Sequence, residues 1–130
     1  MSNKKVMTKG PLSGVRVLDL TTVVMGPFCT QILAELGAEV IKVESHEGDT
    51  IRHVEPRRNS GMGYMFLTLN RGKRSLVLDL KNKEGRGVFL RLVSQADVLI
   101  YNIRPAAMDR LGFSYQNIKR VNERFGYCDF

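Results

Sequence analysis

The fold is decided by residues 15–44, VRVLDLTTVVMGPFCTQILAELGAEVIKVE. Residues 15–20 are β-branched and mostly apolar, which predicts a buried strand. Pro27 suits the first position of a helix, where its missing N–H would be unpaired in any case, and Gly37 suits the left-handed position after a helix end. Residues 38–44 alternate like a second strand. Strand, turn, helix and strand in this order predict a βαβ unit with parallel strands and a right-handed crossover.

The predicted helix carries apolar residues at helical spacing, namely Phe28, Ile32, Leu33 and Leu36. This pattern is typical of a helix that packs one apolar face on a sheet. We expect Cys29, in the first turn, to be packed rather than nucleophilic.

The remaining sequence continues to alternate between strands and helices. After a long polar segment, residues 45–63, order resumes at 64–69. The expected elements are a strand at 75–80, a helix from Asn82 to about Ala96, a strand at 97–101, a short helix at 106–111, a helix capped by Ser114 and a strand at 125–130. The alternation predicts a doubly wound α/β sheet. A terminal parallel strand lacks a covering helix, so we expect another chain or further sequence to cover Phe125, Tyr127 and Phe130.

Composition is typical of a small globular protein. The chain has 130 residues, 43% of them hydrophobic and 25% charged, with two cysteines. No apolar stretch approaches the roughly 18–20 residues that span a bilayer, and residues 1–10 lack the apolar core of a signal peptide. We therefore expect a flexible tail at 1–10, one domain at 11–130, no membrane contact and a cytoplasmic location, which fits the cysteine usage.

The net charge of +7 and the sequence pI near 9.7 favour an anionic partner. The basic residues form three scattered groups around Arg52, Arg71 and Lys119 rather than one run, and aromatic residues do not interleave with them. A solvated basic surface is therefore the better interpretation for most of them, and nucleic-acid binding is not expected.

Three loops follow predicted strands, where open α/β sheets bind ligands: 21–26, 80–82 and 102–105. Lys81 and Arg104 stand in two of them and suit a phosphate group. Glu44 ends the second strand where a ribose-binding acid would lie, but the glycine fingerprint of dinucleotide-binding proteins is missing. His46 and His53 have no ligand cluster at suitable spacing, so no metal site is predicted. The residues alone indicate an anion-binding surface and no catalytic centre.

An ordered series of motifs covers about Pro11 to Cys128, nearly the whole chain. The motifs are PLSGVRVLD (11–19), GPFCTQILAELGAEVIKVE (26–44), GDTIR (48–52), NRGKRSL (70–76), ADVL (96–99), NIRP (102–105) and LGF (111–113). Together they resemble the N-terminal part of the class III CoA-transferases, the family of formyl-CoA and carnitine CoA-transferases and of α-methylacyl-CoA racemase.

The resemblance implies a Rossmann-like parallel sheet with flanking helices that binds coenzyme A or acyl-CoA as a substrate. It implies a larger parent enzyme, an interlocked homodimer, that transfers CoA between carboxylic acids. An aspartate of the parent accepts the acyl group as a mixed anhydride and then becomes an aspartyl-CoA thioester. Because that aspartate lies beyond residue 130 in the family, we expect no catalytic residue within this chain.

The resemblance also places the cofactor-binding positions. They fall on Val24, Met25, Leu78, Asp79, Leu80, Lys81, Asn102, Ile103, Arg104 and Arg110. Lys81, Arg104 and Arg110 would hold the phosphate groups of CoA, and main-chain groups at Leu78 and Leu80 would meet its adenine portion.

Three alternatives remain open at this point. The parent could be a racemase of the same family, or the chain could be a non-catalytic binding fragment or pseudogene product. A basic nucleic-acid-binding module is the third. The tail after Cys128 departs from the family pattern, which a truncated gene or a frameshift would explain.

Overall fold

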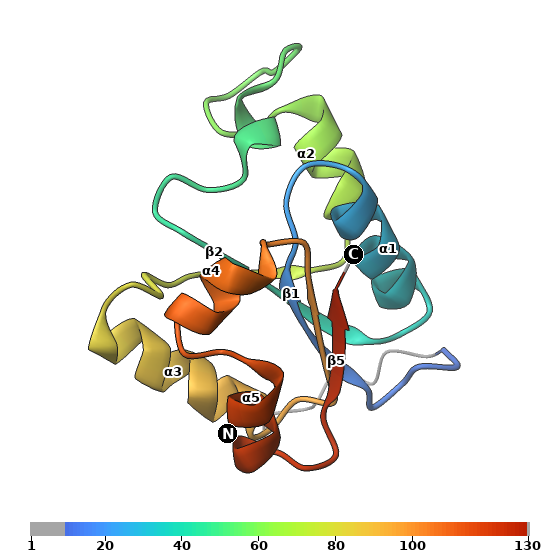
Figure 1. The fold of residues 1–130 in the computed structure, drawn as a ribbon. Helices are drawn as coiled ribbons and strands as arrows, with labels where there is room; N and C mark the ends of the chain where they lie inside the picture. Colours follow the sequence, from blue (N-terminus) through green and yellow to red (C-terminus); the bar gives the residue numbers. More distant parts are fainter. Residues whose placement is uncertain (1–9, 130) are drawn as a thin grey trace, which may run out of the picture.

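The computed structural model describes residues 10–129, and five parallel strands form its centre (Figure 1). The strands are β1 (Arg16–Leu20), β2 (Glu39–Glu44), β3 (Arg74–Val77), β4 (Val98–Tyr101) and β5 (Gly126–Asp129). Their order across the sheet is β3-β2-β1-β4-β5, with every neighbouring pair parallel. The chain thus winds outward in both directions from β1, which confirms the predicted Rossmann-like sheet.

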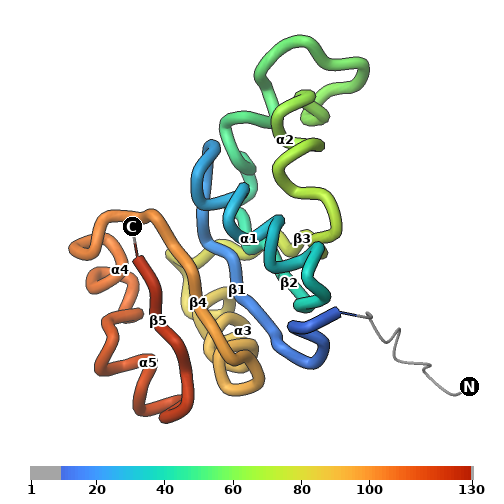
Figure 2. The backbone as a smooth tube through the Cα atoms, turned by 90° about the vertical axis from the view of Figure 1, so that its right-hand side faces the viewer, coloured from blue at the N-terminus to red at the C-terminus, as the bar shows by residue number. Residues whose placement is uncertain are grey.

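Helices cover both faces of the sheet. They are α1 (Met25–Glu35), α2 (Tyr64–Leu69), α3 (Lys83–Val93), α4 (Pro105–Arg110) and α5 (Tyr115–Val121), with a short 3₁₀ helix, η1 (Thr50–His53), before α2. Figure 2 shows α3, α4 and α5 on the opposite side of the strands from α1. The two faces therefore need different residues of each strand, because successive side chains point to opposite sides.

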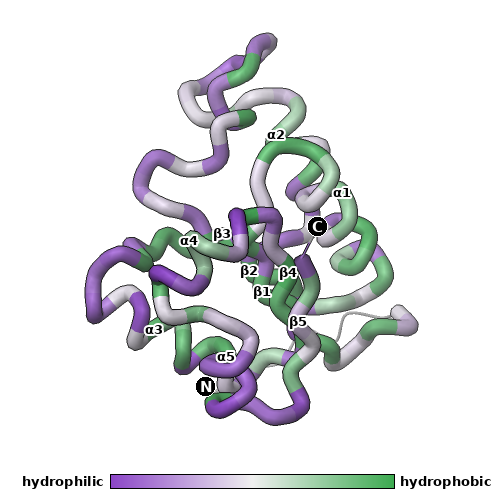
Figure 3. The backbone as a smooth tube through the Cα atoms, viewed as in Figure 1, coloured by the Kyte–Doolittle hydropathy of each residue, from purple (hydrophilic) through white to green (hydrophobic). Residues whose placement is uncertain are grey.

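The strand side chains divide between two cores in this way. Leu18, Leu99 and Tyr101 belong to the larger core, together with Phe89 of α3. Val17, Val40 and Ile100 belong to the smaller core on the α1 side. In Figure 3 the central strands are hydrophobic, whereas the segment leading to α2 is mainly hydrophilic.

The helix ends follow the predicted chemistry. Asn82 Oδ1 accepts a hydrogen bond from the Gly85 N–H at 2.7 Å, and Ser114 Oγ accepts one from Asn117 at 3.3 Å. Gly37 has a φ of 101° after α1, and the following Ala38 N–H bonds to the Leu33 carbonyl at 3.0 Å. This is the Schellman arrangement, in which a left-handed residue satisfies the last carbonyls of a helix.

Three predictions about α1 are wrong. The helix begins at Met25, so Pro27 is its third residue; proline is accepted there because the first four N–H groups of a helix have no partner within it. Its predicted apolar stripe does not face the sheet as a whole: Leu33 packs against the smaller core, but Phe28, Ile32 and Leu36 are exposed. Thr30 and Gln31 are buried instead. Cys29, predicted to be packed, is exposed as well.

The C-terminal strand is also better covered than the sequence suggested. Phe125 is buried in the larger core, and the Tyr127 ring packs edge-on against the Tyr101 and Tyr115 rings. The Tyr127 hydroxyl also donates to the Phe113 carbonyl at 2.7 Å. Part of the cover that we expected from another chain or further sequence thus comes from this chain itself, while Cys128 and Asp129 are exposed. Phe130 and most of the predicted tail lie outside the described residues. No helix among residues 10–129 is long and apolar enough to cross a membrane.

Candidate functional site

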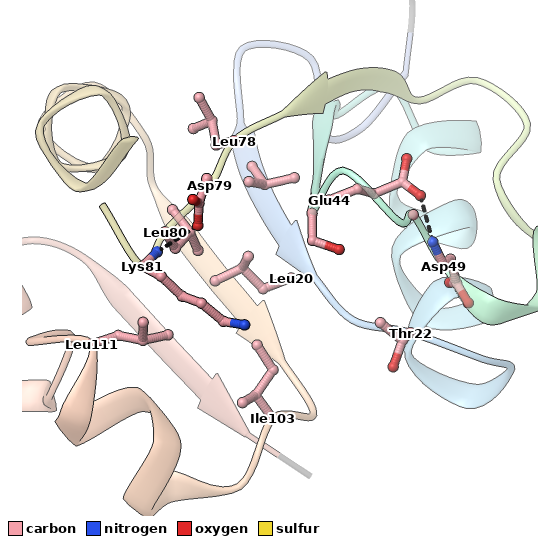
Figure 4. Close-up of a pocket in the computed structure, with 13 residues that line it drawn as sticks. Leu20, Thr22, Glu44, Asp49, Leu78, Asp79, Leu80, Lys81, Ile103 and Leu111 are labelled. Carbon is pink, nitrogen blue, oxygen red and sulfur yellow. Dashed lines mark hydrogen bonds between the residues drawn. The ribbon is translucent and has the colours of Figure 1, made fainter. Parts of the chain in front are cut away.

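A pocket of about 270 Å³ opens at the carboxyl ends of the strands (Figure 4). It is lined by Leu20, Thr22, Val43, Glu44, Ser45, Gly48, Asp49, Leu78, Asp79, Leu80, Lys81, Ile103 and Leu111. The lining comes from the ends of β1 and β2 and from the loops that follow β3 and β4. This includes the point where the strand order reverses, between β1 and β4, which is where open α/β sheets bind ligands.

The pocket combines apolar walls with a charged rim. Leu20, Val43 and Leu111 are among its apolar residues, and its charged residues are Lys81 and the carboxylates Glu44, Asp49 and Asp79. Each of the three carboxylates accepts hydrogen bonds from other residues of the chain. Figure 4 shows the Lys81 side chain extending toward Leu20 and Ile103. Such a site suits a ligand with an apolar or aromatic body and an anionic group.

Half of the predicted cofactor-binding residues line this pocket. Leu78, Asp79, Leu80 and Lys81 form one wall and Ile103 another. The wall is not the strand end that we expected, because β3 stops at Val77 and the chain turns at once. Asp79 fixes this turn: its Oδ1 accepts the Lys81 N–H at 2.9 Å and its Oδ2 accepts the Asn82 side-chain amide at 3.2 Å.

The other predicted residues surround the pocket without lining it. Arg104 and Arg110 are exposed at the two ends of α4, and their chain neighbours Ile103 and Leu111 reach the pocket instead. Val24 and Met25 follow the lining residue Thr22, with Met25 71% exposed. The structure therefore brings the three predicted loops together but leaves these side chains at the periphery.

Asn102 joins two of the loops. Its Oδ1 accepts the Thr22 N–H and its Nδ2 donates to the Thr22 carbonyl, each at 3.0 Å. This reciprocal pair spans the reversal point between β1 and β4. The loop after β1 and the loop after β4 are therefore held in one fixed relation at the edge of the pocket.

A set of buried charges, which was not predicted from the sequence, lies beneath the pocket. Lys42 is 1% exposed, and its Nζ donates to Asp49 Oδ2 at 3.1 Å and to the Thr21 carbonyl at 2.8 Å. An ion pair this deeply buried depends on further hydrogen bonds to offset the loss of hydration. Asp49 has them, because its Oδ1 accepts from the Val23 and Ile51 N–H groups at 3.1 and 3.2 Å.

A second buried pair lies beside the first. Lys73 Nζ donates to Asp19 Oδ2 at 2.9 Å, and the side chains are 2% and 0% exposed. Burial lowers the pKa of Lys73 from its usual value, and the charge and hydrogen bond of Asp19 offset only part of that effect. Lys73 also donates to the Pro27 carbonyl at 2.9 Å, which ties α1 to the turn before β3.

The third pair joins Glu44 to Arg52 of η1. Burial by itself raises the pKa of Glu44, but hydrogen bonds from Arg52 and from the Asp49 N–H outweigh it and hold the pKa below its usual value. The Arg52 guanidinium also stacks over the Phe66 ring at 3.6 Å. The sequence suggested that Arg52 and Lys73 were surface charges. In the structure, each of them instead forms an ion pair with a buried carboxylate.

A pattern in the sequence could have revealed these residues. Asp19 in β1, and Lys42 and Glu44 in β2, interrupt runs of Val, Leu and Ile. Strands of a parallel sheet are buried on both faces, so a charge inside one predicts an internal partner. The partners themselves could not be read from the sequence, because Asp49, Arg52 and Lys73 lie in segments without regular periodicity.

The structure is thus an open parallel α/β sheet with a partly apolar pocket at the carboxyl ends of its strands. Comparison with known proteins gives the family. The model of CoA-transferase family III matches residues 12–130, and the chain belongs to this family.

Characterised relatives match over a limited part of their own length. An acetyl-CoA:oxalate CoA-transferase of Acetobacter aceti is 48% identical over 121 residues, which are 92% of this chain and 31% of the relative. A succinyl-CoA:mesaconate CoA-transferase of Haloarcula hispanica is 44% identical over 117 residues, 87% of this chain and 30% of the relative. The chain thus spans about a third of the length of these relatives.

Solved structures agree on the fold. A CAIB/BAIF family protein from Brucella suis superimposes with a TM-score of 0.87 at 40% identity, covering 92% of this chain and 33% of that one. A hypothetical protein from Mycobacterium tuberculosis gives a TM-score of 0.85 at 38% identity, covering 94% of this chain and 34% of that one.

Proposed function

We propose that this chain binds the CoA portion of an acyl-CoA at the pocket between the ends of β1, β2, β3 and β4. The observation that carries the proposal is the position of Leu78–Lys81 and Ile103. The family resemblance implies that these residues contact CoA, and in the structure they line one pocket at the strand ends.

The chemistry of the pocket supports this ligand. CoA combines an adenine ring and a pantetheine arm with phosphate groups, and the pocket combines leucine and isoleucine walls with the Lys81 ammonium. Arg104 and Arg110 flank the opening on α4. Cations at the rim attract a polyanion and bind phosphate oxygens through charge-assisted hydrogen bonds.

For the whole protein we propose transfer of CoA between small carboxylic acids. The relatives named above are CoA-transferases acting on oxalate and mesaconate, which favours this reaction over racemisation. The acyl group would be accepted by an aspartate contributed by sequence outside these 130 residues, and the aspartyl-CoA thioester formed next would pass CoA to the incoming acid. We also propose a cytoplasmic homodimer as the working form.

Within this chain, the residues would bind and orient CoA rather than react with it. Lys81 would hold phosphate at the rim, and the Asn102–Thr22 pair would keep the two loops at a fixed separation. Holding a thioester in one geometry supplies much of the rate of such transfers, because the reacting groups no longer need to find each other.

The test is the effect of CoA on the melting temperature of the chain. A ligand present at about 100 times its Kd stabilises the folded state by about 2.7 kcal/mol. CoA should raise the melting temperature of the wild type and of Arg91→Ala, an exposed arginine in the last turn of α3 at the opposite end of the sheet. Arg104→Ala should show a smaller rise. Equal rises in melting temperature for the two variants would show that Arg104 is not part of the site. No rise in the wild type would refute CoA binding.

A further inference from the structure

The loop between β1 and α1 contains a backbone conformation that calls for an explanation. Val23 has a φ of 71°, the only positive value among the described residues other than glycine. A β-branched side chain rarely adopts this left-handed conformation, because its Cβ substituents crowd the backbone. Strain of this kind persists only where the surroundings hold it in place.

The buried carboxylate of Asp49 holds this residue. The Val23 N–H lies 3.1 Å from Asp49 Oδ1 and 3.2 Å from Oδ2. On the other side of the turn, the Thr21 carbonyl accepts from Lys42 Nζ at 2.8 Å. Lys42 and Asp49 also form an ion pair with each other. One buried ion pair therefore hydrogen-bonds to the loop on both sides of Thr22, at the Thr21 carbonyl and at the Val23 N–H.

The segment held in this way, Thr21–Val23, adjoins the pocket. Thr22 and Asp49 both line it, and Val24 and Met25 continue directly into α1. A change of Val23 to negative φ would rotate the chain about its N–Cα bond and so alter the position of Thr22 relative to Val24. It would also strain the Thr22–Asn102 pair across the reversal point.

We propose that Asp49 is a positioning residue for the CoA site, and that with Lys42 it holds Thr21–Val23 in the binding-competent turn. The inference rests on the proposed function, because it concerns the same pocket. Asp49 acts through the loop and not on the ligand, since Val23, Ile51 and Lys42 already occupy its two oxygens and its side chain is 0% exposed.

The test compares two double variants in which both charges of the Lys42–Asp49 pair are removed. Lys42→Met/Asp49→Asn retains an amide oxygen that can accept from Val23, whereas Lys42→Met/Asp49→Ala has no acceptor. Both remove the ion pair, so the comparison isolates the hold on Val23 from the loss of charge. Adding Val23→Gly to the second variant removes the steric cost of the left-handed turn.

The readout is the Kd for CoA, measured by titration well below each melting temperature. We expect the Ala variant to bind CoA about tenfold more weakly than the Asn variant, because only a fraction of the Ala variant holds the competent turn. Val23→Gly should restore most of that loss without restoring the melting temperature. Equal affinities of the Asn and Ala variants, or no rescue by glycine, would overturn the proposal.

A second measurement needs neither variants nor ligand. Amide hydrogen exchange of the wild type should show the Val23 N–H strongly protected, as a buried hydrogen bond requires. Free exchange at Val23 would refute the hold by Asp49 even where variants fail to fold. If Val23 is protected and the wild type does not bind CoA, the proposed function fails while the hold on the loop stands.

Discussion

The Arg52 guanidinium donates hydrogen bonds to both oxygens of the Glu44 carboxylate, with Nε 2.9 Å from Oε1 and Nη2 2.6 Å from Oε2. Glu44 is 7% exposed and ends β2 at the pocket, while Arg52 belongs to η1, in the polar segment that follows. A bidentate pair of this kind fixes orientation as well as distance. It therefore fastens the long segment between β2 and α2 to the edge of the sheet.

Replacing Glu44 by glutamine should make the free energy of unfolding less dependent on pH in the acidic range. Because the folded-state pKa of Glu44 is depressed, its contribution is fully present above the pKa of the unfolded chain and is lost as pH falls through the folded value. We expect Glu44→Gln to cost about 2 kcal/mol at pH 7. The difference from the wild type should shrink toward acidic pH in urea unfolding. A difference that stays constant from pH 7 to pH 3 would contradict this role.

The Asp19–Lys73 pair should show strong coupling. Asp19→Asn leaves the Lys73 ammonium buried without its anion, at a cost of about 3–5 kcal/mol. Adding Lys73→Met removes the stranded charge, so the double variant should be more stable than Asp19→Asn alone. Chemical unfolding of the three proteins measures the coupling. A double variant less stable than the single one would show that Lys73 contributes through its other contacts instead.

Two glycines of α3 provide a matched pair. A Cβ on Gly85 would lie 2.0 Å from the Asp79 carbonyl oxygen, whereas one on Gly87 would meet nothing within 4 Å. Gly87→Ala should stabilise the helix by about 0.5–1 kcal/mol. Gly85→Ala should destabilise the chain and displace the pocket wall at Asp79. The free energies of unfolding of the two variants decide this, and a stabilised Gly85→Ala would refute the close packing at the wall.

The ammonium of Lys81 should make CoA binding sensitive to salt. Lys81→Gln should weaken binding by about tenfold, equivalent to about 1.4 kcal/mol, and should flatten the dependence of the Kd on ionic strength, because one charge pair is lost. Lys83→Gln, on the first turn of α3 and outside the pocket lining, is the control. The same loss in both variants would indicate a general attraction to the basic surface rather than a site at Lys81.

The sequence was most informative where local rules act alone. The βαβ unit, the caps at Asn82 and Ser114 and the glycine after α1 follow from periodicity and backbone chemistry, and all are present. The orientation of α1 did not follow, because Thr30 faces inward to donate to Asp19 Oδ2 at 2.6 Å. A hydrogen bond between distant segments outweighed the apolar stripe there.

The candidate site was predictable in place but not in detail. Strand-end loops were identified from the parallel topology, and they meet at one pocket. The hold of Asp49 on Val23 was not foreseeable, because 26 residues separate them and neither lies in a periodic segment. For Arg104 and Arg110, the sequence showed the charge but not the position. Both lie outside the pocket lining, and their position depends on the turns that flank α4.

Isothermal titration of the folded 130-residue protein with CoA measures directly whether this chain carries a CoA site. We predict saturable binding at one site per chain, weakened by Lys81→Gln and not by Lys83→Gln. A cooperatively melting sample that gives no saturable heat at any CoA concentration up to the millimolar range would contradict the account.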